Sequence, residues 1–186
     1  MTFLKWISTA LMLVTLSSVS GHVMAGDTLP EWLISLNHMD GVRPVDNKTY
    51  KTECSSCHMA YQPGLLPAKS WEKLLTPAGL HNHFGEVADL DKETLQEVSD
   101  YAIANSAEKS WFKRARSITA STRDADTPLR ITEVRYISRK HHGIPDTIIK
   151  GNMQVKSLSR CDACHTEAEK GNYDADTVRI PNYPNY

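Results

Sequence analysis

Four cysteines impose the strongest constraint on this chain, because they fall in two pairs with the same spacing. Cys54 and Cys57 form one pair, Cys161 and Cys164 form the other, and the 186 residues contain no further cysteine. Paired cysteines are typical of disulfides in exported proteins and of zinc ribbons. Neither explains why a histidine directly follows each pair.

The pattern Cys-x-x-Cys-His is the attachment signature of a c-type haem. Thiols three positions apart lie about one helical turn from each other, so both can reach the vinyl groups of one porphyrin. The following imidazole then lies beneath the iron, which makes His58 and His165 the expected proximal ligands. The two motifs lie far apart in the chain, which favours two separate sites. We therefore predict two haem c groups, attached through Cys54, Cys57, Cys161 and Cys164.

Residues 1–25 differ from the rest of the chain and are typical of an export signal. Lys5 supplies a positive charge, Trp6–Leu16 is mostly apolar, and Val23-Met24-Ala25 fits a cleavage site. The apolar run is too short to span a bilayer. We predict a signal peptide over 1–25 and a protein that is soluble and periplasmic once the signal is cleaved.

The composition offers little material for a large core. The chain is 40% apolar with three Phe, against about 45–50% apolar residues in ordinary domains. Two porphyrins would supply the missing apolar bulk. We predict a mainly α fold with two small haem-binding units and long irregular loops.

The N-terminal unit is expected over residues 26–108 and the C-terminal unit, which begins with a basic connecting segment, over 109–186. In the N-terminal unit, we predict a short helix at 54–60 and a second helix that starts at Trp71, is capped by Ser70 and is ended by Pro77 and Gly79. A loop at 80–90 follows, and then a helix that is capped by Asp91 and runs to about Ala107. In the C-terminal unit, we predict a linker at 120–128, a strand or extended segment at 129–137, and an attachment helix from Ser159 to Lys170 with Gly171 behind it.

Each iron of a simple electron carrier needs a second axial ligand. His83 follows the first motif in a loop and is flanked by Phe84 and Gly85, so we favour it over the alternative, His81. Before the second motif lie His141 and His142, and spacing alone does not decide between them.

Charge is unevenly distributed although the net charge is only −1. The stretch 109–140 is strongly basic, and acidic patches at 86–100 and 162–176 flank it. A nearly neutral, exported chain is not expected to bind nucleic acid. The asymmetry suits transient electrostatic docking of a redox partner, and some of the basic stretch's arginines could bind haem propionates.

Taken together, these segments resemble the bacterial dihaem cytochrome c family. The matching residues are Gly41-Val-Arg-Pro-Val45, Glu53-Cys-Ser-Ser-Cys-His-Met-Ala-Tyr61, Gly64-Leu-Leu-Pro67, Trp71, His83-Phe-Gly85, Arg130-Ile-Thr132, Arg139-Lys-His141, Cys161-Asp-Ala-Cys-His165 and Val178-Arg-Ile-Pro181. The resemblance implies periplasmic electron transfer, two bis-histidine haems, and distal ligands at His83 and His141. It also implies, as redox partners, small monohaem c-type cytochromes and membrane b-type cytochromes.

Two other functions fit the motifs. A dihaem enzyme of the peroxidase type, or a haem-based sensor of gas ligands, would keep one iron open. The chain is short for such an enzyme, and its two candidate distal histidines argue against an open iron. We therefore expect an electron carrier without a catalytic residue or a substrate of its own.

Overall fold

The computed structural model describes residues 40–186, and the predicted signal peptide lies outside them. The described chain is built from short helices joined by turns, so the expectation of a mainly α fold is confirmed. The helices are α2 (Lys48–Cys54), α3 (Ala68–Leu74), α4 (Pro77–His81), α5 (Lys92–Ala104), α6 (Lys113–Ser121), α7 (Arg135–His141) and α8 (Asp146–Ile149). Further 3₁₀ turns lie at Pro63–Leu65, Ala107–Lys109, Ile131–Glu133, Cys161–Ala163, Ala168–Lys170 and Ala175–Thr177.

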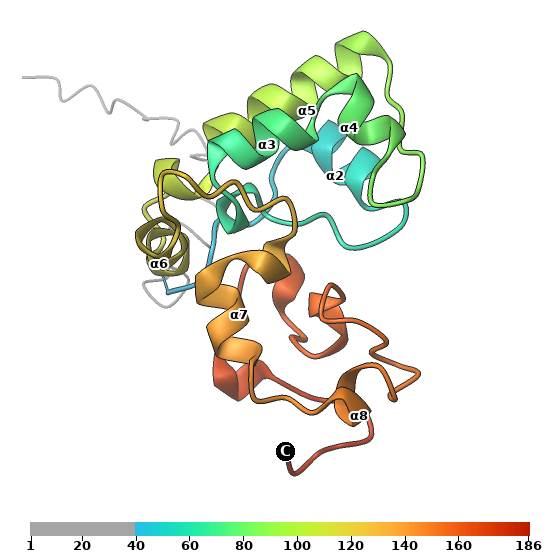
Figure 1. Ribbon diagram of the computed structural model, residues 1–186, viewed down its shortest axis with the longest axis vertical. Coiled ribbons are helices and arrows are strands. Elements are labelled where there is room, and N and C mark those ends of the chain that lie inside the picture. The colour runs from blue at the N-terminus through green and yellow to red at the C-terminus, as the bar shows by residue number, and fades with distance from the viewer. Residues whose placement is uncertain (1–39) are drawn as a thin grey trace, which may run out of the picture.

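Helices α2 to α5 gather at one end of the molecule, and α7, α8 and the C-terminal turns lie at the other (Figure 1). The first group packs around Trp71, whose indole donates a 2.8 Å hydrogen bond to the Pro63 carbonyl. Tyr50, Val98 and Ala102 are buried in the same core. Asp91 caps α5 by accepting from the Thr94 amide, as predicted, although the helix ends at Ala104. This packed group of helices supports the first motif, whose first cysteine, Cys54, is the last residue of α2.

The helix predicted from Trp71 begins earlier, at Ala68 behind Pro67, and Ser70 lies buried inside it. Pro67 sets this start because a proline is compatible with a helix only at its beginning. Pro77 does not merely end a helix, since it opens α4 with Thr76 as the cap. Proline suits the first helical position because its missing N–H would have no intrahelical partner there.

Two predictions for the C-terminal half are wrong. Residues 129–137 form a 3₁₀ turn and the start of α7, and no strand occurs within residues 40–186. The Glu133 carboxylate accepts from the Arg130 amide, which favours a turn over an extended chain. The segment 159–170 contains two 3₁₀ turns and no α-helix. Gly171 does follow the second turn in the left-handed conformation, with φ of 76°.

The predicted linker also shifts, because α6 continues to Ser121 and the irregular segment begins after it.

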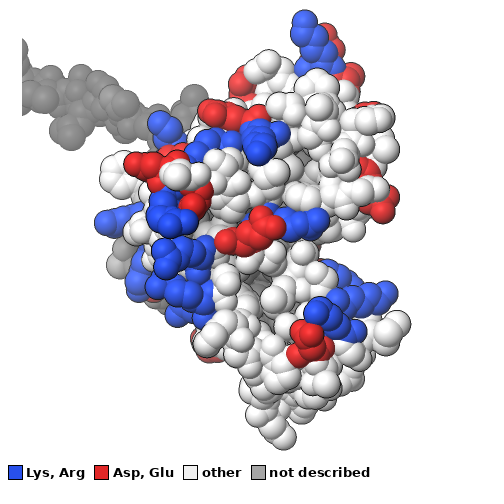
Figure 2. All heavy atoms as spheres, in the orientation of Figure 1, with Lys and Arg blue, Asp and Glu red and all other residues white. Residues whose placement is uncertain are grey.

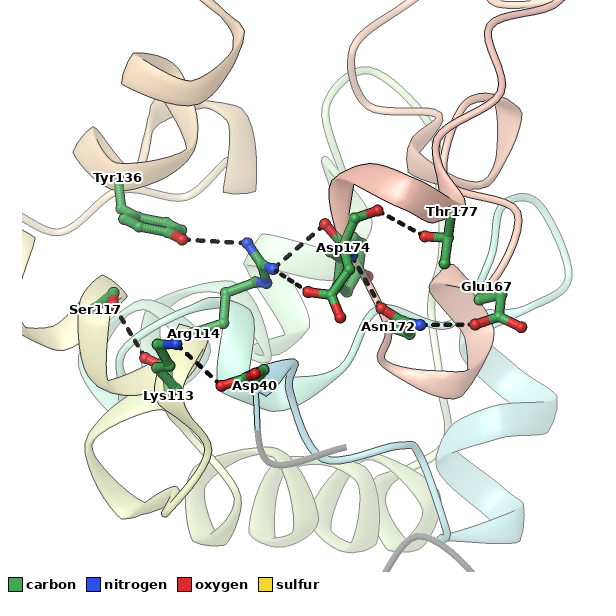
Figure 3. A network of polar contacts seen from close by, with 10 residues as sticks. Asp40, Lys113, Arg114, Ser117, Tyr136, Glu167, Asn172, Asp174 and Thr177 are labelled. Atoms are coloured by element: carbon green, nitrogen blue, oxygen red, sulfur yellow. Dashed lines mark hydrogen bonds and ion pairs between the residues drawn. The ribbon is translucent and has the colours of Figure 1, made fainter. Parts of the chain in front are cut away.

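The two halves meet where Gly41 packs against Gly171, and the Val42 amide donates to the Gly171 carbonyl at 3.0 Å. A second junction centres on Arg114 of α6, which bonds to the Tyr136 hydroxyl at 3.1 Å and to the Asp174 carboxylate at 3.2 Å (Figure 3). The division at residues 108 and 109 stays a prediction. Within 40–186, no helix combines the length and apolarity needed to cross a membrane.

Candidate haem-binding sites

The first motif lies at the end of α2 and not inside a helix as predicted. The helix runs to Cys54, and Cys57 and His58 follow in a turn. Asn47 caps α2 by accepting from the Tyr50 amide at 2.6 Å, which sets where the helix begins. The first cysteine is therefore held by a helix, and the histidine is carried on the turn that leaves it.

His83 faces His58, with ring centroids 6.3 Å apart and planes inclined by 22°. A tight turn aims it there, in which the His83 amide donates to the Glu86 carbonyl at 2.8 Å. Phe84 and Gly85 complete the turn with φ of 58° and 104°. The left-handed region is uncommon for a residue other than glycine, so the turn is specifically shaped.

His81, the alternative distal residue, lies at the end of α4. Its ring is exposed and its Nδ1 pairs with the Asp89 carboxylate at 3.0 Å. The described structure thus brings His83, and not His81, into ring contact with His58.

The second motif starts in the 3₁₀ turn Cys161–Ala163, and its histidine faces the last residue of α7. The rings of His165 and His141 lie 6.0 Å apart, with planes at 71°. The neighbouring His142 is exposed at the end of α7. The structure therefore pairs His141 with His165, a choice that spacing left open.

A cavity of about 550 Å³ surrounds this second pair. Its lining combines both cysteines and both histidines with branched apolar side chains, among them Ile131, Ile137, Ile144, Ile148, Ile149 and Val155. A mostly apolar pocket of this size with a few convergent polar groups is typical of a cofactor site. The donor set and the apolar walls both fit a haem.

One imidazole in each pair is oriented by a backbone carbonyl. His58 Nδ1 bonds to the Met59 carbonyl at 2.7 Å, and His141 Nδ1 bonds to that of Ile137 at 2.8 Å. When Nδ1 donates in this way, Nε2 keeps its lone pair and is free to bind a metal. The geometry thus selects the tautomer that ligation requires.

The local electrostatics also favour the neutral form of two of these histidines, His165 and His83. Burial, helped by nearby His141 and Arg114, lowers the pKa of His165 to about 4. The pKa of His83 is lowered by burial and by His58 and Arg130. A neutral imidazole is the form that binds a metal, so both rings are ready to do so at neutral pH.

The cysteines are free of disulfides, which leaves all four available for thioethers. Burial raises the pKa of Cys54 to about 12 and that of Cys161 to about 11, so both are thiols at neutral pH. No group of three or more His, Cys, Asp or Glu side chains in the described part of the chain is arranged to hold a metal ion. The residues of each motif fit covalent haem attachment.

Sequence reasoning missed two aromatic residues at these sites. Tyr61 stacks on His58 with centroids 4.6 Å apart, and Tyr173 packs edge-on against His165 at 5.2 Å. Tyr61 lies three positions after its histidine, a spacing that could have singled it out. Tyr173 contacts His165 only because the folded chain returns to this site, so no pattern among neighbouring residues predicts the contact. Arg114, one of the arginines considered for propionate binding, lines the second cavity.

Two Cys-x-x-Cys-His motifs, each with a second imidazole facing its own, define a c-type cytochrome with two haems. The profile of the family described as "Dihaem cytochrome c" matches residues 50–173. The chain belongs to this family and carries two haem c groups, and the family implies haem-based electron transfer.

Solved structures agree with this assignment. A diheme cytochrome c from Rhodobacter sphaeroides is 41% identical, with a TM-score of 0.62 over 71% of this chain and 100% of the other. A diheme cytochrome type c from Shewanella baltica OS155 is 38% identical, with a TM-score of 0.60 over 73% of this chain and 94% of the other. No curated protein matches the chain at a significant level.

Proposed function

We propose that this protein is a periplasmic electron carrier whose haems are each ligated by two histidines. His58 and His83 would hold the first iron, and His165 and His141 would hold the second. The observation that carries this proposal is the pair of ring separations, 6.3 Å and 6.0 Å.

These separations suit an iron between the rings. A metal–imidazole bond of about 2 Å, plus about 1.1 Å from nitrogen to ring centre, puts two opposed ligand rings about 6.2 Å apart. Both pairs lie within a few tenths of an ångström of this value. Rings in direct contact also have centroids about 4.5–7 Å apart, so it is the Cys-x-x-Cys-His motif at each pair that favours an iron between the rings.

When bound, the haem supplies a one-electron redox centre. With two imidazoles on each iron, no coordination position is open for a substrate, which suits a carrier better than a peroxidase-like enzyme or a gas sensor. Met/His ligation raises a haem potential, so bis-histidine ligation gives a lower one. The chain's own residues orient His58 and His141 through backbone carbonyls and line the second site with branched apolar side chains.

Arg114 is the best-placed candidate to bind a propionate. Its side chain is 16% exposed, it lines the second cavity, and its Nε is buried without an acceptor among the described residues. A guanidinium N–H in such a place suits a carboxylate. The ion pair with Asp174 holds the guanidinium in position for that contact (Figure 3).

The proposed redox partners are proteins, among them a small monohaem c-type cytochrome and a membrane b-type cytochrome. Lys and Arg side chains gather along the edge formed by α6 (Figure 2). Arg123, Arg135 and Arg139 line a groove between α6 and α7. A partner with an acidic surface would dock there, and the rate of electron exchange would fall as ionic strength rises.

Carbon monoxide binding tests the proposed ligation. The dithionite-reduced protein is mixed with carbon monoxide and its Soret band is followed. We expect no rapid binding, because both irons are already six-coordinate. Stoichiometric binding within the mixing time would refute bis-histidine ligation and favour an enzyme or a sensor with an open iron.

A further inference from the structure

The dipeptide Tyr61-Gln62, which follows the first motif, touches residues of the second site. The Tyr61 ring stacks on His58 at 4.6 Å with planes at 26°. Its hydroxyl donates to the carbonyl of Ser159, two residues before Cys161. Tyr61 therefore contacts the proximal histidine of one site and the backbone that carries the cysteine of the other.

Gln62 continues this connection from inside the protein. Its side chain is fully buried, its amide donates to the Ala168 carbonyl at 2.6 Å, and its Oε1 accepts from the Tyr173 hydroxyl at 2.6 Å. The Tyr173 ring in turn packs edge-on against His165 at 5.2 Å. A continuous chain of contacts thus joins His58 to His165.

The surroundings hold this chain of contacts rigid and uncharged. The Tyr61 carbonyl accepts from the Tyr50 hydroxyl at 2.8 Å, and the Tyr173 carbonyl accepts from Arg114 at 3.3 Å. Burial is the main cause that raises the pKa of both Tyr61 and Tyr173, so both phenols stay neutral.

Packing alone does not require a polar residue at position 62. A buried amide is costly unless its donors and acceptors are satisfied, and an apolar side chain of similar size would fill the same space. The amide of Gln62 is satisfied entirely by groups that carry the second site. Its placement suits a specific link between the two sites.

We propose that Tyr61, Gln62 and Tyr173 form a bridge that positions both proximal imidazoles as one unit. The orientation of His58 then depends on groups at the second site, and that of His165 on groups at the first. Such a coupling is reciprocal. The inference rests on the proposed function, which makes these two histidines iron ligands.

The test compares Tyr61→Phe and Tyr173→Phe in the haem-loaded protein. Each variant removes one hydroxyl and keeps the ring that packs on its own histidine. The readout is the low-temperature EPR spectrum of the oxidised protein, which reports the orientation of the axial imidazoles at each iron. Tyr101→Phe is the matched control, because its hydroxyl bonds to Asp46 and to no residue of the bridge.

We expect each single substitution to shift the signals of both haems, and the double variant to shift them by less than the sum. The control should leave both signals unchanged. A substitution that shifts the signal of only one haem, or of neither haem, would overturn the bridge.

Gln62→Leu adds a further measurement. If it folds, it should shift both signals, because it removes the centre of the bridge; if it does not fold, the two tyrosine variants decide. Failure of the proposed ligation is distinguishable, since the unmodified protein would then show a high-spin signal or bind carbon monoxide.

Discussion

Removal of the His83 imidazole should open one of the two irons and leave the other untouched. In the structure, the His58–His83 planes are inclined by 22° and the His141–His165 planes by 71°. Imidazole planes orient the iron's π-type d orbitals. Near-parallel planes separate the energies of these orbitals, whereas near-perpendicular planes bring them together and widen the spread of g-values. The oxidised protein should therefore give two distinct low-spin signals.

The variant His83→Ala should lose the signal of the near-parallel pair and gain a high-spin signal for half of the haem. The strongly anisotropic signal of the second pair should remain. After reduction, the variant should bind one carbon monoxide per chain, or half an equivalent per haem, because only one iron has lost a ligand. EPR spectroscopy and a carbon monoxide titration measure these two fractions independently.

His81→Ala is the matched control, since it removes an exposed imidazole two positions away that pairs with Asp89. Both low-spin signals should survive in it, and carbon monoxide should not bind. Survival of both low-spin signals in His83→Ala, or an open iron in His81→Ala, would refute the role of His83 as a ligand.

Three further predictions concern stability and docking. Gly171→Ala should lower the free energy of unfolding by about 1–3 kcal/mol in a denaturant titration, because φ is 76° and a Cβ would lie 2.1 Å from the Val42 carbonyl oxygen. Gly143→Ala, where a Cβ meets nothing within 4 Å, should cost much less, and equal costs would contradict this account. Hydrogen bonds from Thr94 lower the pKa of Asp91. The ionised Asp91 cap therefore stabilises α5 fully at pH values above the usual carboxyl pKa, and this stabilisation is lost as pH falls through the lowered pKa. The thermal midpoint of the wild type should therefore fall more steeply below about pH 4 than that of Asp91→Asn, and parallel profiles would exclude this role. Charge reversal by Arg135→Glu with Arg139→Glu should slow electron exchange with an acidic partner and weaken its dependence on ionic strength, as stopped-flow mixing would measure; an unchanged rate would place docking elsewhere.

Several features of the fold could be predicted because they depend on neighbours in sequence. The cap at Asp91 needs only an acceptor before the amide of Thr94, and Gly171 needs only its own freedom to adopt a positive φ. The wrong predictions concern segments that surround a haem site. Residues 129–137 alternate like a strand, yet they form a turn and a helix that line the second cavity. Such short elements are set by what they pack against, since few backbone hydrogen bonds hold them on their own.

The chemistry of haem attachment follows from residues that are neighbours in the sequence. Two thiols and an imidazole at a fixed local spacing are enough to specify a covalently bound haem, whatever the rest of the chain does. Only the folded chain shows which histidine faces each motif, because it places His83 against His58 and His141 against His165 and leaves His81 and His142 exposed. It alone brought Tyr173 to His165 and Gln62 to Tyr173. Neighbouring histidines are equivalent in local spacing, and only the direction that a turn or a helix end imposes on each side chain tells them apart.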